Sequence, residues 1–139
     1  MKPSLITLIL ILVFNSCSTP VAEQVKQLNG YWEIEKVELP SGETKTYGIN
    51  RTVDYIELKN DTSGIRTKLS PKIDGSFISN NNYEIFSLIN KEGKLYMIYN
   101  TPFSKWEEEI LKVDKDQLIV INTEKLKYFY KRYQKLSID

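Results

Sequence analysis

The chain contains no histidine and only one cysteine, Cys17, among its 139 residues. Histidine is the commonest general base and metal ligand, and it activates the nucleophile in Ser-His and Cys-His pairs. A zinc site would have to use carboxylates alone, which is unusual. A lone cysteine cannot form an internal disulfide. The composition therefore argues against the commonest catalytic pairs and metal sites, and it leaves the fold to depend on its hydrophobic core.

Charge of one sign is not concentrated anywhere in the chain. There are 19 basic and 18 acidic residues, giving a formal net charge of +1. Nucleic-acid-binding domains usually present a clustered basic face, so we predict no nucleic-acid partner. The densest acidic patch is Glu107–Glu109. Side chains alternate along a strand, so these three would not converge on one ion, and we interpret them as a solvated edge.

The sequence also lacks a glycine-rich phosphate-binding loop. Its scattered acidic residues always offer some carboxylate pair, but no activating geometry can be argued for any pair. We therefore expect a protein that is not an enzyme, with no catalytic residues, no metal and no cofactor.

Only one long apolar run occurs, and it lies at the N-terminus. The run from Leu5 to Phe14 is apolar except for Thr7, and the basic Lys2 precedes it. A basic start, an apolar stretch of this length and a small residue at the cut are typical of a secretory signal. The run is too short for a permanent membrane helix, which needs ~20 residues. We predict that residues 1–16 are a signal peptide.

The lone cysteine stands where this apolar run ends. Ser16-Cys17 resembles the lipobox of bacterial lipoproteins, in which the thiol receives diacylglycerol and acyl chains such as palmitate, and signal peptidase II cuts before the cysteine. The resemblance implies that Cys17 is a lipid anchor and that residues 17–27 form the lipidated cysteine and a tether. The protein would then lie in the bacterial cell envelope, with the outer membrane favoured over the inner. An ordinary secretory signal with an unmodified thiol is the alternative.

From Gly30 onward, short runs of apolar, β-branched and aromatic residues alternate with turn residues. This pattern is typical of strands, and such tight links join antiparallel neighbours. We predict strands at 31–39, 53–59, 64–69, 73–78, 83–90, 94–100, 105–113, 117–123 and 126–134, after one or two helical turns within 22–28. Closing the sheet would remove its exposed edges. We therefore expect an all-β domain at 28–139, an antiparallel up-and-down barrel of eight or nine strands.

The first strand opens with Leu28-Asn29-Gly30-Tyr31-Trp32, which contains a Gly-x-Trp motif. This motif resembles the lipocalin signature, and more closely the small lipocalin-like lipoproteins of Bacteroidetes-type bacteria. The resemblance extends over residues 28–134 in strand order. It implies that Trp32 plugs one end of the barrel, with a basic residue of the last strand, Arg132, lying across its indole. It also implies a small hydrophobic ligand inside the barrel.

Aromatic residues are plentiful, with nine Tyr and two Trp. Several lie in strands where they could face the barrel interior: Tyr55, Phe86, Tyr96, Tyr99, Trp106 and Tyr128. We take all of these except Tyr99 as candidate ligand contacts, because aromatic side chains commonly line small-molecule sites. The alternative is that they fill the interior, since eight-stranded barrels are narrow enough to be packed by side chains. Residues 101–104 form an apolar loop at an expected barrel mouth.

Two classes of function remain open at this stage. The first is non-catalytic binding of a small hydrophobic ligand at a membrane surface. The second is an envelope protein-binding module, an inhibitor or an accessory subunit, which would use the outer face or loops of the barrel. An internal void of ~300 Å³ or more would favour the first class. A packed interior with an exposed apolar patch would favour the second.

We predict that the wild-type protein fractionates with membranes and that Cys17→Ala does not. Two or three acyl chains on Cys17 would each contribute ~0.8 kcal/mol per buried CH₂, enough for stable anchoring. The variant should appear as soluble or uncleaved protein when membrane and soluble fractions are immunoblotted. Ser18→Ala, one residue further on, is the matched control and should fractionate like wild type. Normal processing and fractionation of Cys17→Ala would contradict the lipid anchor.

Overall fold

A computed structural model describes residues 20–135, and the predicted signal peptide and Cys17 lie outside the described residues. One short helix precedes a series of strands. In chain order the elements are α1 (Val21–Gln27), β1 (Gly30–Glu38), β2 (Thr44–Thr46), β3 (Val53–Asn60), β4 (Ser63–Pro71), β5 (Phe77–Lys91), β6 (Lys94–Asn100), β7 (Lys105–Val113), β8 (Gln117–Asn122) and β9 (Lys127–Arg132).

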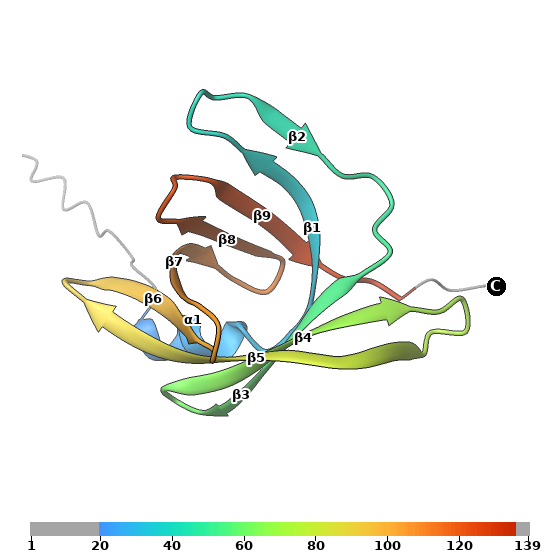
Figure 1. The fold of residues 1–139 in the computed structure, drawn as a ribbon, viewed down its shortest axis with the longest axis horizontal. Coiled ribbons are helices and arrows are strands. Elements are labelled where there is room, and N and C mark those ends of the chain that lie inside the picture. Colours follow the sequence, from blue (N-terminus) through green and yellow to red (C-terminus); the bar gives the residue numbers. More distant parts are fainter. Residues whose placement is uncertain (1–19, 136–139) are drawn as a thin grey trace, which may run out of the picture.

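The strands close into an antiparallel barrel of eight strands with β2 added outside it (Figure 1). Each of β3 to β9 pairs with its neighbour in sequence, and β1 closes the ring by pairing with both β3 and β9. The closing ladder runs from Trp32 opposite Arg132 to Glu38 opposite Lys127. The predicted up-and-down barrel is therefore confirmed.

The strand boundaries differ from the prediction around the β4–β5 hairpin. The predicted strands 73–78 and 83–90 are replaced by the single strand β5, and Asp74-Gly75 lies in the turn before it. Asn81 has a φ of 59°, and the β4–β5 register shifts opposite it, between Thr67 and Leu69. Asparagine tolerates this left-handed conformation, so a β-bulge carries the strand through a segment predicted as a break. The short strand β2 was not predicted.

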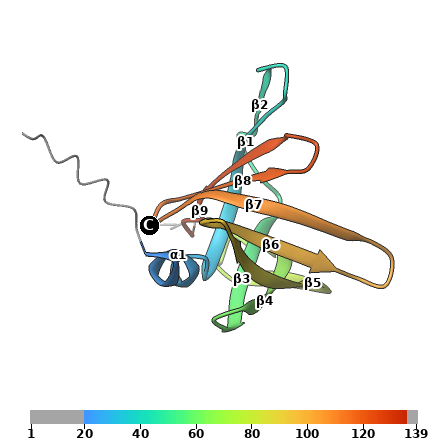
Figure 2. The ribbon, with the colours of Figure 1, turned by 90° about the vertical axis from the view of Figure 1, so that its left-hand side faces the viewer.

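The helix α1 belongs to the folded domain rather than to a tether. Val25 and Leu28 are both buried in the core cluster beneath it. Figure 2 shows α1 at one end of the barrel and the turn between β6 and β7 at the opposite end. Residues 21–27, which we had assigned to the tether, therefore close one end of the barrel.

The loop of residues 47–52 covers part of the edge of β1. β3 pairs with β1 only from Gly30 to Trp32, and β2 pairs with it only from Lys36 to Glu38. Between them, the backbone N–H of Tyr47 donates to the Glu35 carbonyl at 2.9 Å, and the Asn50 side chain donates to the Ile34 carbonyl at 2.8 Å. The loop thus satisfies backbone groups that would otherwise be exposed at a strand edge.

The core lies in the half of the barrel next to α1. It consists of inward-facing apolar side chains from every barrel strand except β4, joined by two from the helical segment. Its buried members are Val25, Leu28, Trp32, Ile56, Phe86, Leu88, Leu95, Met97, Tyr99, Ile110, Val113, Leu118, Val120 and Tyr130. Full burial of one such side chain contributes about 1.5–3 kcal/mol, so this cluster supplies the main driving force for folding.

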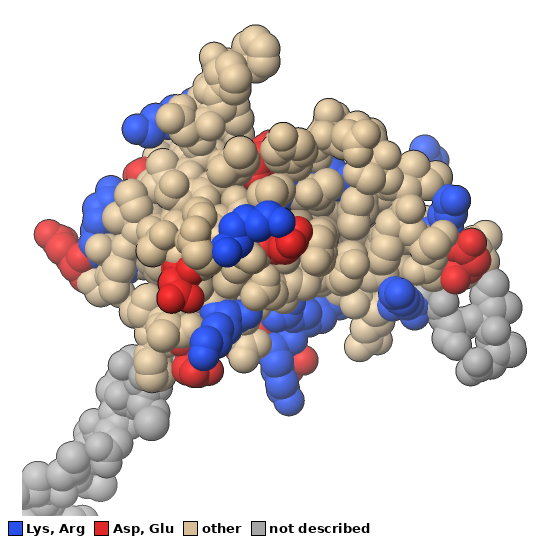
Figure 3. Space-filling view, turned by 90° about the horizontal axis from the view of Figure 1, so that it is seen from below, with Lys and Arg blue, Asp and Glu red and all other residues tan. Residues whose placement is uncertain are grey.

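The outer surface carries charges of both signs. Exposed lysines pair with carboxylates on the same or neighbouring strands, as in Lys59–Glu57 and Lys127–Glu38. Figure 3 shows basic and acidic side chains interspersed over the face seen from below. Among residues 20–135 no helix is long and apolar enough to cross a membrane.

Gly64 allows the Phe86 ring to lie against β4. A Cβ at position 64 would lie 2.5 Å from Cζ of Phe86 and 2.8 Å from the carbonyl oxygen of Glu57. The second contact is with backbone, which cannot move aside easily. We expect Gly64→Ala to lower the free energy of unfolding by about 1–3 kcal/mol, as overpacking of a core does.

Urea unfolding followed by circular dichroism measures this loss. Gly48→Ala is the matched control, because a Cβ there meets no atom within 4 Å. The control should change stability by less than about 0.5 kcal/mol. Equal stability of the two variants would show that the Phe86 ring is not held against Gly64.

Candidate ligand-binding site

The end of the barrel next to α1 is sealed by Trp32 and Arg132. Trp32 is 1% exposed, and its indole N–H donates to the Leu28 carbonyl at 2.8 Å. The guanidinium carbon of Arg132 lies 3.7 Å from the centroid of the indole. A guanidinium on an indole face is attracted by ~1–2 kcal/mol when shielded from water. The contact implied by the Gly-x-Trp resemblance is therefore present.

Arg132 also fastens the helix to the barrel. Its guanidinium donates to the backbone carbonyls of Gln27, the last residue of α1, and of Asn29 just after it. It also donates to the carbonyl of Lys115 in the β7–β8 turn. Gly30 has a φ of +123°, and a Cβ there would lie 2.7 Å from Nη1 of Arg132. The glycine of Gly-x-Trp is thus explained by the close approach of this guanidinium.

The opposite half of the barrel contains an open cavity of about 970 Å³. Its mouth is formed by the bulge Asn80–Asn82 of β5 and by the β6–β7 loop Thr101–Ser104. Its inner wall includes the side chains of Lys68, Trp106 and Tyr128. A second hollow of about 180 Å³ shares Asp54, Lys68 and Tyr128 with the first, so the two adjoin.

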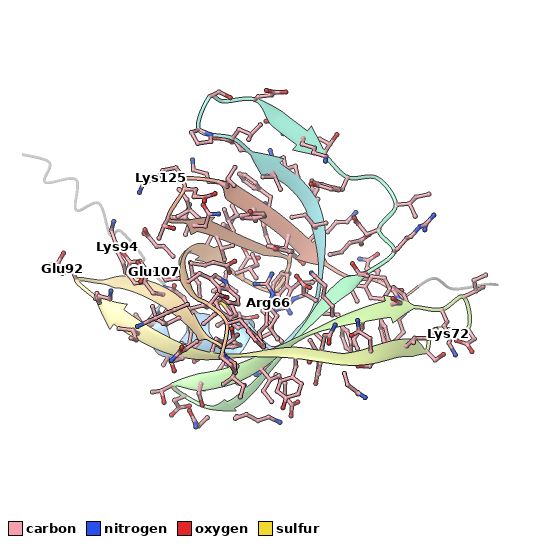
Figure 4. All side chains as sticks on the ribbon, in the orientation of Figure 1. Arg66, Lys72, Glu92, Lys94, Glu107 and Lys125 are labelled. Carbon is pink, nitrogen blue, oxygen red and sulfur yellow. The ribbon has the colours of Figure 1, made fainter. Side chains whose placement is uncertain are left out.

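Arg66 forms the floor of this cavity, and Figure 4 shows it within the ring of strands. Its Nη1 donates to the Tyr99 hydroxyl at 2.9 Å and to Glu108 Oε2 at 3.1 Å. Its Nη2 donates to Asp54 Oδ2 and to the Tyr130 hydroxyl, both at 2.8 Å. All four Nη hydrogens are therefore used, and the side chain is only 10% exposed.

These contacts determine the ionisation of the floor. Burial alone would raise the pKa of Asp54, but Arg66 and Lys68 together lower it below its usual value. Burial alone would lower the pKa of Arg66, but Tyr99, Tyr130 and the two carboxylates raise it further above its usual range. Burial raises the pKa of Tyr130 to about 12. At neutral pH the floor is thus a charged network with neutral phenols.

Three aromatic rings connect the packed core to the cavity. Phe86 and Tyr99 lie with their centroids 5.9 Å apart, and both are buried. Tyr99 in turn stacks on Trp106 at 4.8 Å with an interplanar angle of 7°. Trp106 is half-buried and lines the cavity. The orientation of the Trp106 indole is therefore fixed by its stacking on the buried Tyr99 ring.

The candidate ligand contacts chosen from the sequence are only partly brought together. Trp106 and Tyr128 line the cavity, whereas Phe86 lies beneath it in the core. Tyr55 and Tyr96 face outward, so their assignment to the interior was wrong. The physical reason is strand register. Side chains alternate between the two faces of a strand, and the neighbours of Tyr55 and Tyr96 in sequence point inward, so these two rings point outward.

The outward rings have other partners. Tyr55 stacks on Tyr31 at 4.6 Å, and Tyr31 stacks on Phe77 at 4.8 Å. The Tyr96 ring lies 4.9 Å from the ammonium group of Lys91. These contacts attach strands and the β4–β5 hairpin to one another on the outer wall, where a ligand in the barrel would not reach them.

The sequence interpretation missed the charged floor altogether. Glu107 and Glu109 lie on the outer face as expected, but Glu108 points inward and is only 13% exposed, so the solvated-edge interpretation was wrong for it. One signal was available. Asp54 is two residues from Ile56 in the same strand, so both side chains lie on the same, inward-facing surface. The sequence therefore placed a carboxylate inside the barrel. A buried carboxylate requires a cation nearby.

Comparisons with known proteins gave one family match and several similar solved structures. A family model described as a lipocalin-like domain matches residues 28–120. No curated protein is detectably similar in sequence. Similar solved structures include a lipocalin-like protein from Bacteroides uniformis ATCC 8492, with 12% identity, a TM-score of 0.48, and coverage of 77% of this chain and 99% of its own. An uncharacterized protein from Bacteroides eggerthii DSM 20697 has 11% identity, a TM-score of 0.47 and coverage of 76% and 99%.

We expect Asp54→Asn to destabilise the protein at pH 7 by about 3–5 kcal/mol, because it leaves Arg66 with one buried carboxylate fewer. The folded-state pKa of Asp54 lies below 3.8, so folding favours the ionised form. This stabilisation is present above about pH 3.8 and is lost as the pH falls through the folded-state pKa. The difference between wild type and variant should therefore shrink in acid.

Urea unfolding at a series of pH values measures both effects. Asp61→Asn, an exposed residue of the β3–β4 turn, controls for the removal of one carboxylate and should follow wild type. Wild-type stability of Asp54→Asn at pH 7 would show that the other partners of Arg66 suffice.

Proposed function

Because this chain belongs to the family of lipocalin-like domains, we propose that it binds a small ligand in the open half of its barrel, without catalysis. The observation that carries the proposal is the cavity of about 970 Å³, within the range typical of small-molecule sites. Eight-stranded barrels are wide enough to hold one small ligand. Non-catalytic binding accords with the floor, whose charged groups are engaged with one another.

The walls of the cavity favour a ligand with an apolar body. Trp106 and Tyr128 supply aromatic surface, and Pro102 adds aliphatic surface nearer the mouth. The floor is charged, so the ligand would not be surrounded by apolar groups on every side. We therefore propose an amphipathic small molecule. This class differs from the hydrophobic ligand expected from the sequence, because the ligand must also carry a polar group.

We also propose that the domain acts in the bacterial cell envelope, attached through lipid on Cys17. The support is the sequence alone: a single cysteine directly after an apolar signal, with Ser16 before the cut. Cys17 lies outside the described residues, so membrane fractionation of Cys17→Ala tests this part of the proposal.

The alternative, a protein-binding module, is favoured by one feature of the outer wall. Tyr83 and Ile85 of β5 point outward and are 59% and 56% exposed. Exposed apolar patches often mark protein contacts. The interior of this barrel is hollow at one end, however, which is the condition that favours a small ligand.

Tryptophan fluorescence tests the ligand-binding proposal, because only one of the two tryptophans lines the large cavity. Trp106 lines that cavity, whereas Trp32 is 1% exposed beneath Arg132 and borders only the smaller adjoining hollow. We expect a saturable fluorescence change on titration with fatty acids or flat hydrophobic compounds. The change should be lost in Trp106→Phe and kept in a folded Trp32→Phe.

Native mass spectrometry of the domain purified from its own host provides a second measurement, which should reveal a co-purifying small molecule. No saturable change with any compound, together with no co-purifying molecule, would contradict the proposal and favour the protein-binding alternative.

A further inference from the structure

One wall of the cavity is a rigid aromatic platform. Tyr99 stacks on Trp106 with nearly parallel rings, and Arg66 holds the Tyr99 hydroxyl at 2.9 Å. The surface of Trp106 that Tyr99 leaves uncovered lines the cavity. Because the indole is already oriented, a flat ring stacking on it would lose little freedom of the protein. The platform therefore fits a planar aromatic group, for which offset stacking is favourable.

The two cations of the cavity, Arg66 and Lys68, differ in how many hydrogen-bond donors remain free for a ligand. Arg66 uses all four of its Nη hydrogens on groups of the floor. The Lys68 ammonium donates to Asp54 Oδ1 at 2.8 Å, and its side chain is 64% exposed. An ammonium has three donors, so Lys68 keeps two for another acceptor. Among residues 20–135, no group hydrogen-bonds the Tyr128 hydroxyl, which lines the same two hollows.

The carboxylates of the cavity are less available. Both oxygens of Asp54 accept hydrogen bonds, one from Arg66 and one from Lys68. Oε2 of Glu108 accepts a hydrogen bond from Arg66, so only the other carboxylate oxygen of Glu108 remains free. Glu84 is exposed, as the Lys68 side chain is, so water screens both charges. The donors left free on Lys68 and Tyr128 suit an acceptor-rich anion.

We infer that the ligand is a planar aromatic acid, with its ring stacked on Trp106 and its carboxylate held by Lys68 beside the Tyr128 hydroxyl. This inference rests on the proposed function and narrows its ligand class. Binding of the anion leaves the floor intact, because Asp54 remains paired with Arg66. Hydrogen bonds between charged groups are stronger than neutral ones, so the carboxylate supplies selectivity and the ring supplies contact area.

Three probes that share the naphthalene ring test the inference by isothermal titration calorimetry at pH 7: 2-naphthoate, the neutral 2-naphthamide and the cationic 2-naphthylmethylammonium. Wild type should bind the naphthoate ~10-fold more tightly than the amide, the effect of one charge-assisted contact. Lys68→Gln should reduce naphthoate affinity to about that of the amide, and the loss should be much larger for the naphthoate than for the amide. Lys68→Arg should keep the preference.

Lys59→Gln is the matched control, since Lys59 lies on the outer wall paired with Glu57. It should bind all three probes like wild type, and thermal unfolding should show every variant folded. Equal affinity for naphthoate and amide, tighter binding of the cation, or unchanged naphthoate binding in Lys68→Gln would overturn the inference. In those cases Trp106-dependent binding of the amide would leave the proposed function standing. Failure of all three probes to bind would overturn the inference, and the proposed function would fall with it if native mass spectrometry also found no co-purifying molecule.

Discussion

The buried guanidinium of Arg66 is the constraint on which the interior of this barrel depends. Transfer of a charge from water costs several kcal/mol, so Arg66 must be surrounded by acceptors. Those acceptors come from other strands: Asp54 from β3, Tyr99 from β6, Glu108 from β7 and Tyr130 from β9. One side chain therefore fixes the relative positions of most of the ring. A polar network satisfied in this way rigidifies its surroundings.

The same network divides the barrel into two halves with different roles. On one side lie the apolar core and the seal made by Trp32, Arg132 and α1. On the other side lies the cavity, whose wall includes Trp106 and Tyr128. Tyr99 belongs to both halves, because its ring packs in the core while its hydroxyl accepts from Arg66. The floor therefore serves both halves, because Asp54 and Arg66 stabilise the fold and also line the cavity.

The barrel could be predicted from the sequence because it depends on local signals, and the Trp32–Arg132 contact at its sealed end was expected from the family resemblance. Turn residues mark the hairpins, and Gly-x-Trp identifies the start of the ring. The cavity could not be predicted, because which face of a strand points inward depends on register with distant strands. In β4 the usual alternation is reversed: Ile65 and Leu69 face outward while Arg66 and Lys68 face the interior. Tyr55 and Tyr96 were misplaced for the same reason.

The position of α1 has a consequence for how a ligand reaches the protein. Three residues separate Cys17 from Val21, the first residue of α1, a span of at most about 14 Å when fully extended. With lipid on Cys17, the sealed end would stand at the bilayer surface, and the mouth, at the opposite end of the barrel, would open toward the aqueous compartment (Figure 2). A molecule would then enter from water and not by lateral diffusion out of the bilayer. Solubility in water, rather than partitioning into lipid, would govern which compounds this barrel meets.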